Sequence, residues 1–498
     1  MPGPRPGRGP GTFRWRRPGT FRSPGIAVPL LIALAFLVLL VAAVAVDPAR
    51  GVTASTSPYT DEGWNVANAR DLVMFGTWAT DDWRMYVLNF PFSALEAAWL
   101  AIAGVGIVQA RLLVIACGAI ALGTLGIGLR RQLGAAGASL AAAALGGSAL
   151  LLYYGRLAYL EPLVMLWLIA ALALLARSRP SLATGVLAGV ALALAIATKA
   201  SAGFAVAGLL AGVALVGWRD PGVRRAVAGA VLGLLVVALA WAAVFAVPIP
   251  AALATDLRIW APEPLPHSVT ELVRRITSYP SRSDGGIPLA LPLLLAGAGG
   301  LLVTLVRHAD LTAEQRRLAA ACIGWFAVGM GVLLVVPYRP NRYLVPLLPP
   351  LAVLAGLGFA LVVRWAGERP VLVAGAGLAL AVALAGPGLV LQLGWATSTP
   401  STLPEVQARV AALVPPGSVV QGDLAPVLAM QARATTIVSR PATSVNSGDL
   451  YETRGVRWVL TAGPAPQWAA LHPAAWEART RELCVAWGPG ETCLYRLP

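Results

Sequence analysis

Two adjacent acids, Asp61 and Glu62, stand in the polar run TSPYTDEGWNVANAR, which follows the first long apolar segment of the chain. Charged side chains are costly near a bilayer, so acids in this position invite an explanation. A carboxylate at a membrane face can take the proton of a hydroxyl group as a general base. The pair is therefore a candidate catalytic feature, and the alternative is two solvated carboxylates in a loop.

Further charges stand at the ends of apolar segments rather than within them. The candidates are Asp81 and Asp82 in TWATDDWRMYVLNFPFS, Arg156 and Glu161 in YYGRLAYLEPLVMLW, Lys199 in AIATKASAG, Arg258 in DLRIWAPEPLPHSVTELVRRI, and Arg342 in PYRPNRYLVPLLPP. Lys199 is the only lysine among 38 basic residues. Because ammonium and guanidinium groups are not interchangeable, it indicates a need for a compact cation, or else chance retention.

The elements that must position these charges are membrane spans. Of the 498 residues, 57% are hydrophobic and only 12% are charged, and the mean hydropathy is +0.72, so we expect a polytopic α-helical membrane protein. About eleven apolar stretches are long enough to span. They are 26–46, 110–129, 136–154, 159–176, 182–198, 200–218, 226–247, 287–306, 319–337, 343–363 and 371–391.

Arginines set the predicted orientation. With a cytoplasmic N-terminus every inner loop is basic, as the positive-inside rule requires. These loops contain Arg130 and Arg131, Arg177 and Arg179, Arg219, Arg224 and Arg225, Arg307, Arg316 and Arg317, and Arg364 and Arg369. The arginine-rich tail 1–25 is then cytoplasmic, a transmembrane domain covers 26–391, and its outer loops are 47–109 and 248–286. Phe92–Gly106 is expected to lie along the outer interface.

On this map the candidate acids and cations meet on the outer face of a bacterial plasma membrane. The second outer loop is either an interfacial lid or an ordinary connector. The net charge of +15 does not indicate nucleic acid, because the arginines are scattered among apolar segments. Membrane lipid is the partner that an arginine-rich tail fits.

Residues 392–498 have the composition of a soluble domain. Strand candidates alternate with helical stretches, which predicts a small extracytoplasmic α/β domain. In the terminal run ELCVAWGPGETCLYRL a hairpin would set Cys484 opposite Cys493, as a disulfide or as two free thiols. The sequence has no CxxC, HExxH or P-loop motif, and no zinc site or nucleotide-driven pump is expected.

Carboxylates can activate a hydroxyl, and cations can hold a phosphate. Transfer of a sugar from a lipid-linked phosphate carrier needs both at a membrane surface. The alternatives are a multi-pass transporter or lipid-linked-sugar flippase, and a membrane scaffold whose tail binds a partner. Transporters often show repeated halves and charges in the middle of a span. The sequence has neither feature, so it does not favour a transporter.

The order of these motifs resembles the polyprenyl-phosphate-sugar-dependent glycosyltransferases of the membrane-embedded GT-C superfamily, which includes protein O-mannosyltransferases and the transferase that adds aminoarabinose to lipid A. The resemblance covers roughly residues 26–365. It implies an inverting transfer from a polyprenyl-phosphate sugar to a hydroxyl on a glycan, lipid or protein. It leaves a divalent metal ion open and implies no other cofactor.

The resemblance also implies roles for the candidate residues. Asp61 matches the catalytic base and Glu62 its companion, while Asp81 and Asp82 compete for a second acid that could bind acceptor or metal. Arg156 and Glu161 match an arginine followed five residues later by an acid, and both are further candidates to bind acceptor or metal. Arg342 and Tyr343 match a motif that contacts the carrier phosphate, with Lys199 or Arg258 as helpers.

Overall fold

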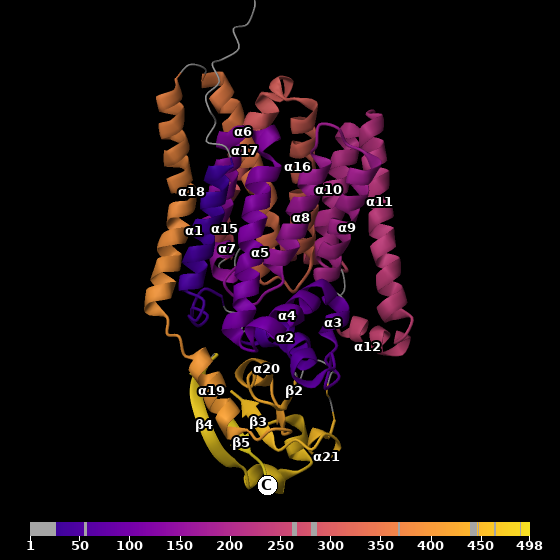
Figure 1. Cartoon of the computed structure of the whole chain (residues 1–498), viewed down its shortest axis with the longest axis vertical. Coiled ribbons are helices and arrows are strands. Elements are labelled where there is room, and N and C mark those ends of the chain that lie inside the picture. Colours follow the sequence, from indigo (N-terminus) through magenta and orange to yellow (C-terminus); the bar gives the residue numbers. More distant parts are fainter. Residues whose placement is uncertain are drawn as a thin grey trace, which may run out of the picture.

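A computed structural model describes residues 26–498 except 54–56, 261–265, 280–285, 367–368, 439–445, 447, 463–464 and 489. Figure 1 shows a bundle of long helices with a small sheet-containing domain attached to one end. We call this end of the bundle the domain end. The helices α2 (Ser57–Phe75), α3 (Met85–Leu88) and α4 (Phe90–Ala103) lie between the bundle and the C-terminal domain.

The bundle is built from helices that match the apolar stretches of the sequence. They are α1 (Ala27–Ala42), α5 (Ile107–Gly128), α6 (Arg130–Gly146), α7 (Ala149–Tyr154), α8 (Glu161–Leu175), α9 (Leu182–Thr198), α10 (Ala202–Gly217), α11 (Pro221–Trp241) with η1 (Ala242–Ala246), α15 (Gly286–Val306), α16 (Ala313–Val335), η3 (Asn341–Leu347) with α17 (Leu348–Ala366), and α18 (Pro370–Ser398). Every predicted span overlaps one of them.

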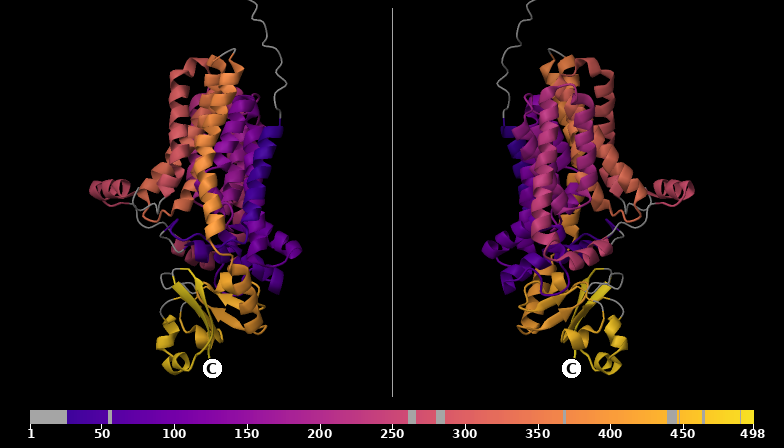
Figure 2. Two further views of the ribbon diagram at one scale, coloured as in Figure 1. Left: turned by 90° about the vertical axis from the view of Figure 1, so that its left-hand side faces the viewer. Right: turned by 90° about the vertical axis from the view of Figure 1, so that its right-hand side faces the viewer.

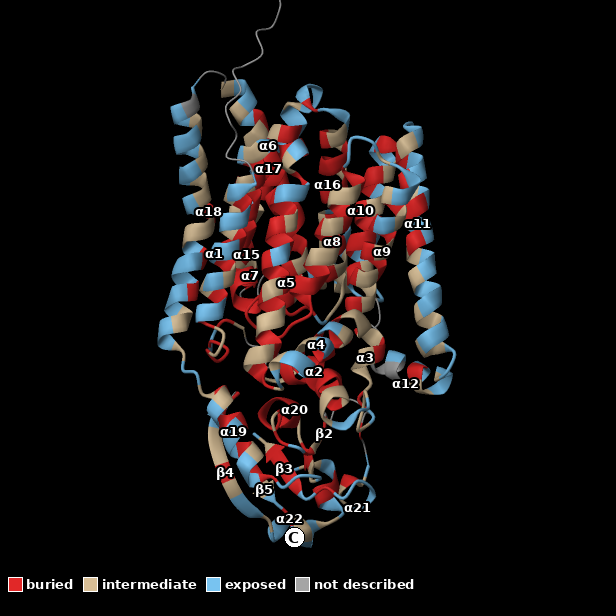
Figure 3. Cartoon of the chain, in the orientation of Figure 1, coloured by how far each residue is buried: buried red, intermediate tan, exposed pale blue. Residues whose placement is uncertain are grey.

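Six of the described helices are each long and apolar enough to cross a membrane, and shorter apolar helices pack among them. Figure 3 shows exposed residues along the outward sides of α11 and α18, where these helices would face lipid. The chain is therefore a multi-pass membrane protein with the predicted helical fold class. The short 3₁₀ helix η2 (His308–Asp310) joins α15 to α16.

Two predicted spans have different bounds in the structure. The stretch 136–154 is interrupted between α6 and α7, where Ser148 has an extended backbone (φ −63°, ψ 127°). Helix α18 continues to Ser398, so the predicted start of the C-terminal domain at 392 falls inside a helix. The apolar residues that follow 391, in LQLGWATS, extend the helix beyond the segment needed to cross a membrane.

The predicted outer loops are largely helical, so the expectation that Asp61 and Glu62 lie in a loop was wrong. Both lie in the second turn of α2. Helix α4 overlaps the predicted interfacial segment Phe92–Gly106. The second loop contains α12 (Pro250–Trp260) and α13 (Val269–Thr277). Figure 2 shows α13 projecting sideways from the bundle.

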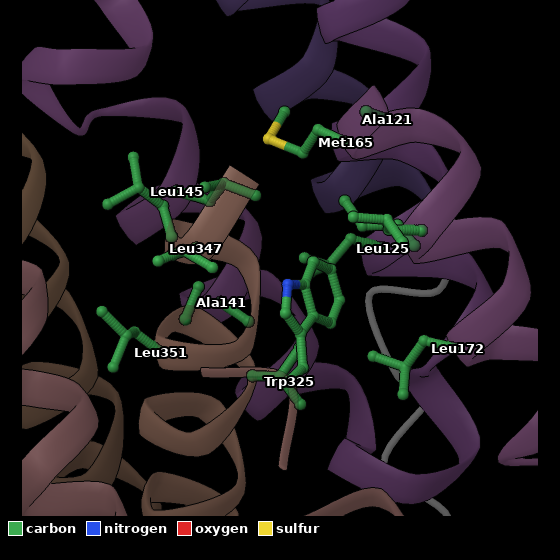
Figure 4. Close-up of a cluster of buried hydrophobic side chains, with 14 of the residues drawn as sticks. Ala121, Leu125, Ala141, Leu145, Met165, Leu172, Trp325, Leu347 and Leu351 are labelled. Carbon is green, nitrogen blue, oxygen red and sulfur yellow. The ribbon is translucent and has the colours of Figure 1, made fainter. Parts of the chain in front are cut away.

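Close contacts fix the helices that carry the site. A Cβ atom added to Gly189 of α9 would lie 2.1 Å from the carbonyl oxygen of Ala230 in α11, so the two backbones touch. In the bundle core Trp325 of α16 packs near Leu125 of α5 and Leu172 of α8 (Figure 4). Leu347 of η3 belongs to the same core, which anchors the segment that carries Arg342.

The C-terminal domain contains α19 (Leu403–Leu413) and a five-stranded sheet of order β2-β1-β3-β5-β4. The strands are β1 (Val419–Gln421), β2 (Thr435–Ile437), β3 (Trp458–Thr461), β4 (Thr480–Trp487) and β5 (Gly490–Arg496). Strands β2, β1 and β3 are parallel, and β5 is antiparallel to both β3 and β4. The short elements are α20 (Ala425–Leu428), α21 (Leu450–Thr453), η4 (Gln467–Ala470) and α22 (Pro473–Glu477).

The terminal run forms a hairpin of β4 and β5. Cys484 lies opposite Cys493 in the β4–β5 register, and the two form a disulfide. Cys117 and Cys322 are buried in the bundle as free thiols.

Candidate functional site

Asp61 is the first residue of the candidate site. It lies in the second turn of α2, where its carboxylate oxygen Oδ2 is 2.6 Å from Nη1 of Arg342. Its other oxygen accepts a hydrogen bond from the hydroxyl of Thr60 at 3.2 Å. The side chain keeps 14% of its surface exposed. Burial raises the pKa of Asp61 above its usual value of 3.8, and Arg342 opposes this increase.

Arg342 comes from η3, between α16 and α17, and lies among aromatic rings. Its guanidinium carbon is 5.3 Å from the ring centre of Tyr159, 5.5 Å from that of Tyr343 and 6.0 Å from that of Tyr338. Its Nη2 donates a hydrogen bond to the Tyr338 hydroxyl at 3.1 Å. The rings hold the cation in place by cation–π attraction without neutralising it.

Glu161 and Lys199 complete the site. Glu161 begins α8, Lys199 follows the last residue of α9, and the two form a short ion pair. Oε1 of Glu161 also lies 3.8 Å from Nε of Arg342. The ammonium of Lys199 is 4.1 Å from the ring centre of Tyr343. Asp61, Glu161, Lys199 and Arg342, from separate elements, therefore form one buried group, which we call the four-charge cluster.

The four-charge cluster combines groups with opposite chemical abilities. The Asp61 carboxylate can accept a proton, and Arg342 and Lys199 can bind an anion such as a phosphate. Oε2 of Glu161 is buried without a hydrogen-bond partner, which leaves an acceptor free at the centre of the site. These abilities coincide with those that the sequence assigned to Asp61, Lys199 and Arg342.

Glu62 points elsewhere, although it is adjacent to Asp61. Its carboxylate forms a two-pronged ion pair with Nε and Nη2 of Arg111 in α5, at 2.8 and 2.7 Å. It also accepts the backbone N–H of Ala158 at 2.7 Å. Because Glu62 is fully buried and bonded in this way, it cannot approach a substrate. The carboxylate of Glu161 contributes to the raised pKa of Asp61 by like charge.

Arg156 also lies outside the four-charge cluster. Its guanidinium donates to the carbonyl oxygens of Val46 and Asp47, at 2.6 and 2.9 Å. The side chain is 1% exposed. Although it stands five positions from Glu161 in the sequence, it binds the segment that follows α1 and contacts no member of the cluster.

Asp81 and Asp82 face the C-terminal domain. Asp81 accepts hydrogen bonds from the backbone N–H of Trp83 and the amide of Asn446, at 2.9 and 2.8 Å. Burial raises the pKa of Asp81 to about 6. Asp82 forms a half-exposed ion pair with Arg454 at 3.1 Å. Neither acid belongs to the four-charge cluster.

A divalent metal does not fit the four-charge cluster. Its acids, Asp61 and Glu161, are already paired with Arg342 and Lys199, whereas a metal site gathers carboxylates without interleaved cations. Among the residues that the structure describes, the one group of three metal-ligand side chains is Cys484, Glu491 and Cys493. Its cysteines are joined as a disulfide.

Sequence reasoning missed Arg111, Tyr159 and Tyr338. Arg111 is the one charged residue of a mostly apolar span, a feature that indicates a buried partner. Both tyrosines lie within a few positions of predicted site residues. The side chain of the predicted phosphate ligand Arg258, in α12, lies outside the described residues.

No protein-family model and no curated protein sequence matches the chain. Solved structures do. The structure of ArnT from Cupriavidus metallidurans bound to undecaprenyl phosphate has a TM-score of 0.62 at 19% identity and covers 93% of this chain and 97% of its own. Archaeal oligosaccharyltransferase AglB from Archaeoglobus fulgidus, with an inhibitory peptide and a dolichol-phosphate, has a TM-score of 0.56 at 13% identity, covering 89% and 70%.

The apo form of the Archaeoglobus fulgidus oligosaccharyltransferase gives a TM-score of 0.52 at 13% identity, covering 86% of this chain and 69% of its own. At these identities the likeness is one of fold. The chain therefore has the GT-C fold that the order of its motifs suggested.

Proposed function

We propose that this protein is a glycosyltransferase that moves a sugar from a polyprenyl-phosphate carrier to a hydroxyl acceptor. The observation that supports this most is the ion pair between Asp61 and Arg342 inside a four-charge cluster at the domain end of the bundle. The cluster offers a base for the acceptor hydroxyl and two cations for the carrier phosphate, which are the two groups exchanged at the sugar. The ArnT and AglB structures of the same fold were solved with lipid phosphates bound.

In the proposed reaction Arg342 and Lys199 hold the carrier phosphate. The acceptor oxygen attacks the anomeric carbon of the sugar and gives its proton to Asp61. The bond from that carbon to the phosphate oxygen breaks, and its electron pair leaves with the polyprenyl phosphate. A single displacement of this kind inverts the anomeric centre. Arg342 and Lys199 stabilise the charge that develops on the leaving phosphate.

The ion pair also implies an order in which the donor binds before the acceptor reacts. Arg342 is paired with the carboxylate of Asp61. A phosphate that binds Arg342 competes with Asp61 for the guanidinium. Donor binding would therefore release Asp61 at the moment when a base is required, and a hydroxyl acceptor would react only after the donor has bound.

We further propose that the domain end faces the outside of a bacterial plasma membrane and that the N-terminus is cytoplasmic. The predicted inner loops are basic. The disulfide between Cys484 and Cys493 supports this orientation, because disulfides persist in oxidising compartments. The acceptor would then be a glycan, lipid or protein of the cell envelope.

The proposal is tested with purified protein in lipid vesicles. We expect labelled sugar to pass from a polyprenyl-phosphate donor to a hydroxyl acceptor, with release of polyprenyl phosphate. Movement of the intact donor across the vesicle membrane without a new glycosidic bond would contradict the proposal and indicate a flippase. Failure to bind any polyprenyl-phosphate sugar would contradict it as well.

A further inference from the structure

The C-terminal domain packs against α2, the helix that carries Asp61. Figure 1 shows α2 between the bundle and this domain. We propose that the C-terminal domain is a positioning part of the catalytic site, which holds α2 so that Asp61 meets Arg342. This inference rests on the proposed function, because it assigns the domain a task in that reaction.

The first observation is the contact at Gly63, two positions after Asp61. A Cβ atom added to Gly63 would lie 2.4 Å from the backbone nitrogen of Val427 and 2.8 Å from the backbone carbon of Pro426. Both atoms belong to α20 of the C-terminal domain. The two backbones are therefore in direct contact, and only glycine allows α2 to come so close.

The second observation is Arg70, which is buried without exposed surface near the middle of α2. Its guanidinium donates hydrogen bonds to three backbone carbonyl oxygens of one loop of the domain, those of Met430, Ala432 and Ala434, at 2.8, 2.6 and 2.7 Å. It also pairs with Asp71 at 2.8 Å. A buried guanidinium that lost these acceptors would be strongly disfavoured, so Arg70 ties α2 to the loop.

Contacts at the start of α2 also join this helix to the C-terminal domain. The indole N–H of Trp64 donates to the carbonyl oxygen of Asp423 at 2.8 Å. Tyr59 meets Trp487 edge to face, with ring centres 5.4 Å apart. Trp487 belongs to the hairpin that the disulfide closes.

The geometry of α2 explains how these contacts reach Asp61. Residues of an α-helix are rotated by about 100° each, so Arg70 lies within about 20° of Gly63 around the axis, and Asp61 lies about 160° from Gly63. One face of α2 thus rests on the C-terminal domain, while the opposite face presents Asp61 to Arg342. A shift of α2 away from α20 would change the Asp61–Arg342 geometry directly.

The test is Gly63→Ala. The added methyl group must push α2 away from backbone atoms that cannot give way, and misplacement of a catalytic group by about 1 Å can cost about 10²-fold in rate. We expect kcat to fall about 10- to 100-fold. The donor KM should change little, because Arg342 and Lys199 belong to other elements. Gly203→Ala in α10 is the matched control, since its Cβ would meet nothing within 4 Å.

Two results would overturn the proposal. One is a Gly63→Ala variant with kcat within about twofold of the wild type. The other is an equal loss of kcat and donor affinity in a correctly folded variant, because this would show damage to the whole site. If Gly63→Ala does not fold, Trp64→Phe is held to the same criteria. This variant removes the indole N–H bond to Asp423 and part of the ring that packs against Trp83.

Hydrogen exchange separates this inference from the proposed function. If the wild-type protein transfers no sugar, the proposed function fails. Amide exchange at the start of α2 then still tests the contact itself, and we expect it to be faster in Gly63→Ala than in Gly203→Ala. Equal exchange in the two variants would show that the domain does not hold α2.

Discussion

The four-charge cluster places Asp61, the proposed base, in direct contact with Arg342, the cation that we propose binds the carrier phosphate. Asp61 and Arg342 are 2.6 Å apart, and Lys199 and Glu161 form the second pair beside them. Each cation is paired with one acid. The cluster therefore brings together the base and the cations that the proposed sugar transfer requires.

The pH dependence of kcat should reflect the protonation of Asp61. Protonated Asp61 cannot act as a base, so kcat must fall as the pH drops through its pKa. Because burial raises that pKa, we expect the decline at a pH above the usual value of 3.8 for an aspartate. Measurement of kcat against pH at saturating donor checks this. A kcat that stays constant down to pH 4 would contradict the role of Asp61.

Lys199→Met should weaken donor binding more than it slows the reaction. The variant loses an ammonium that contacts Glu161 and the ring of Tyr343. Hydrogen bonds to charged groups contribute about 1.5–3 kcal/mol, so the donor KM should rise about 10- to 100-fold. Arg454→Met, which removes a cation from the half-exposed pair with Asp82, is the control and should leave the donor KM unchanged. An unchanged donor KM in Lys199→Met would remove Lys199 from the phosphate site.

At the scale of elements, the Glu62–Arg111 pair joins α2 to α5. Arg111 also donates to the carbonyl oxygens of Val44 and Val46, at 2.9 Å each. Arg156 binds the neighbouring carbonyls of Val46 and Asp47. Asp47 in turn accepts the backbone N–H of Leu403 at the start of α19. A continuous set of buried bonds thus connects α2, the segment after α1 and the C-terminal domain.

Arg111→Met should destabilise the fold, because it leaves the Glu62 carboxylate buried without a cation. Breaking a buried pair in this way costs about 3–5 kcal/mol. Thermal unfolding in detergent measures the effect, and the double variant Glu62→Gln/Arg111→Met should recover part of the loss. If Glu62→Gln alone abolished transfer without lowering the unfolding temperature, Glu62 would have a catalytic role after all.

Sequence reasoning succeeded where hydropathy determines structure. Each apolar stretch had to become a helix, because backbone groups in a bilayer must be paired within the segment. It failed for α2, whose residues are too mixed in polarity to show a helical stripe. The inward orientation of Arg156 also depends on carbonyls about a hundred positions earlier, which neighbouring residues do not reveal.

At the scale of the whole molecule, the helical bundle and the C-terminal domain enclose α2 from opposite sides. Val66 of α2, Val114 of α5 and Leu428 of α20 belong to one hydrophobic cluster. The domain is therefore packed as part of the protein rather than attached as a tail. This architecture supports its proposed role in positioning Asp61.

The proposed orientation predicts the outcome of cysteine labelling in intact cells. A cysteine placed at exposed Arg481 should react with a membrane-impermeant reagent from outside, whereas one placed at exposed Arg131 should react only after the membrane is opened. Labelling of both positions from the same side would contradict the predicted map of spans.

The most direct test of the central claim is single-turnover sugar transfer by Asp61→Asn with saturating polyprenyl-phosphate donor. We predict a loss of about 10²–10⁴-fold relative to the wild type, because a positioned general base contributes about this much. Asp82→Asn, which changes a nearby acid outside the four-charge cluster, should transfer sugar at the wild-type rate. A wild-type rate in Asp61→Asn would contradict the account.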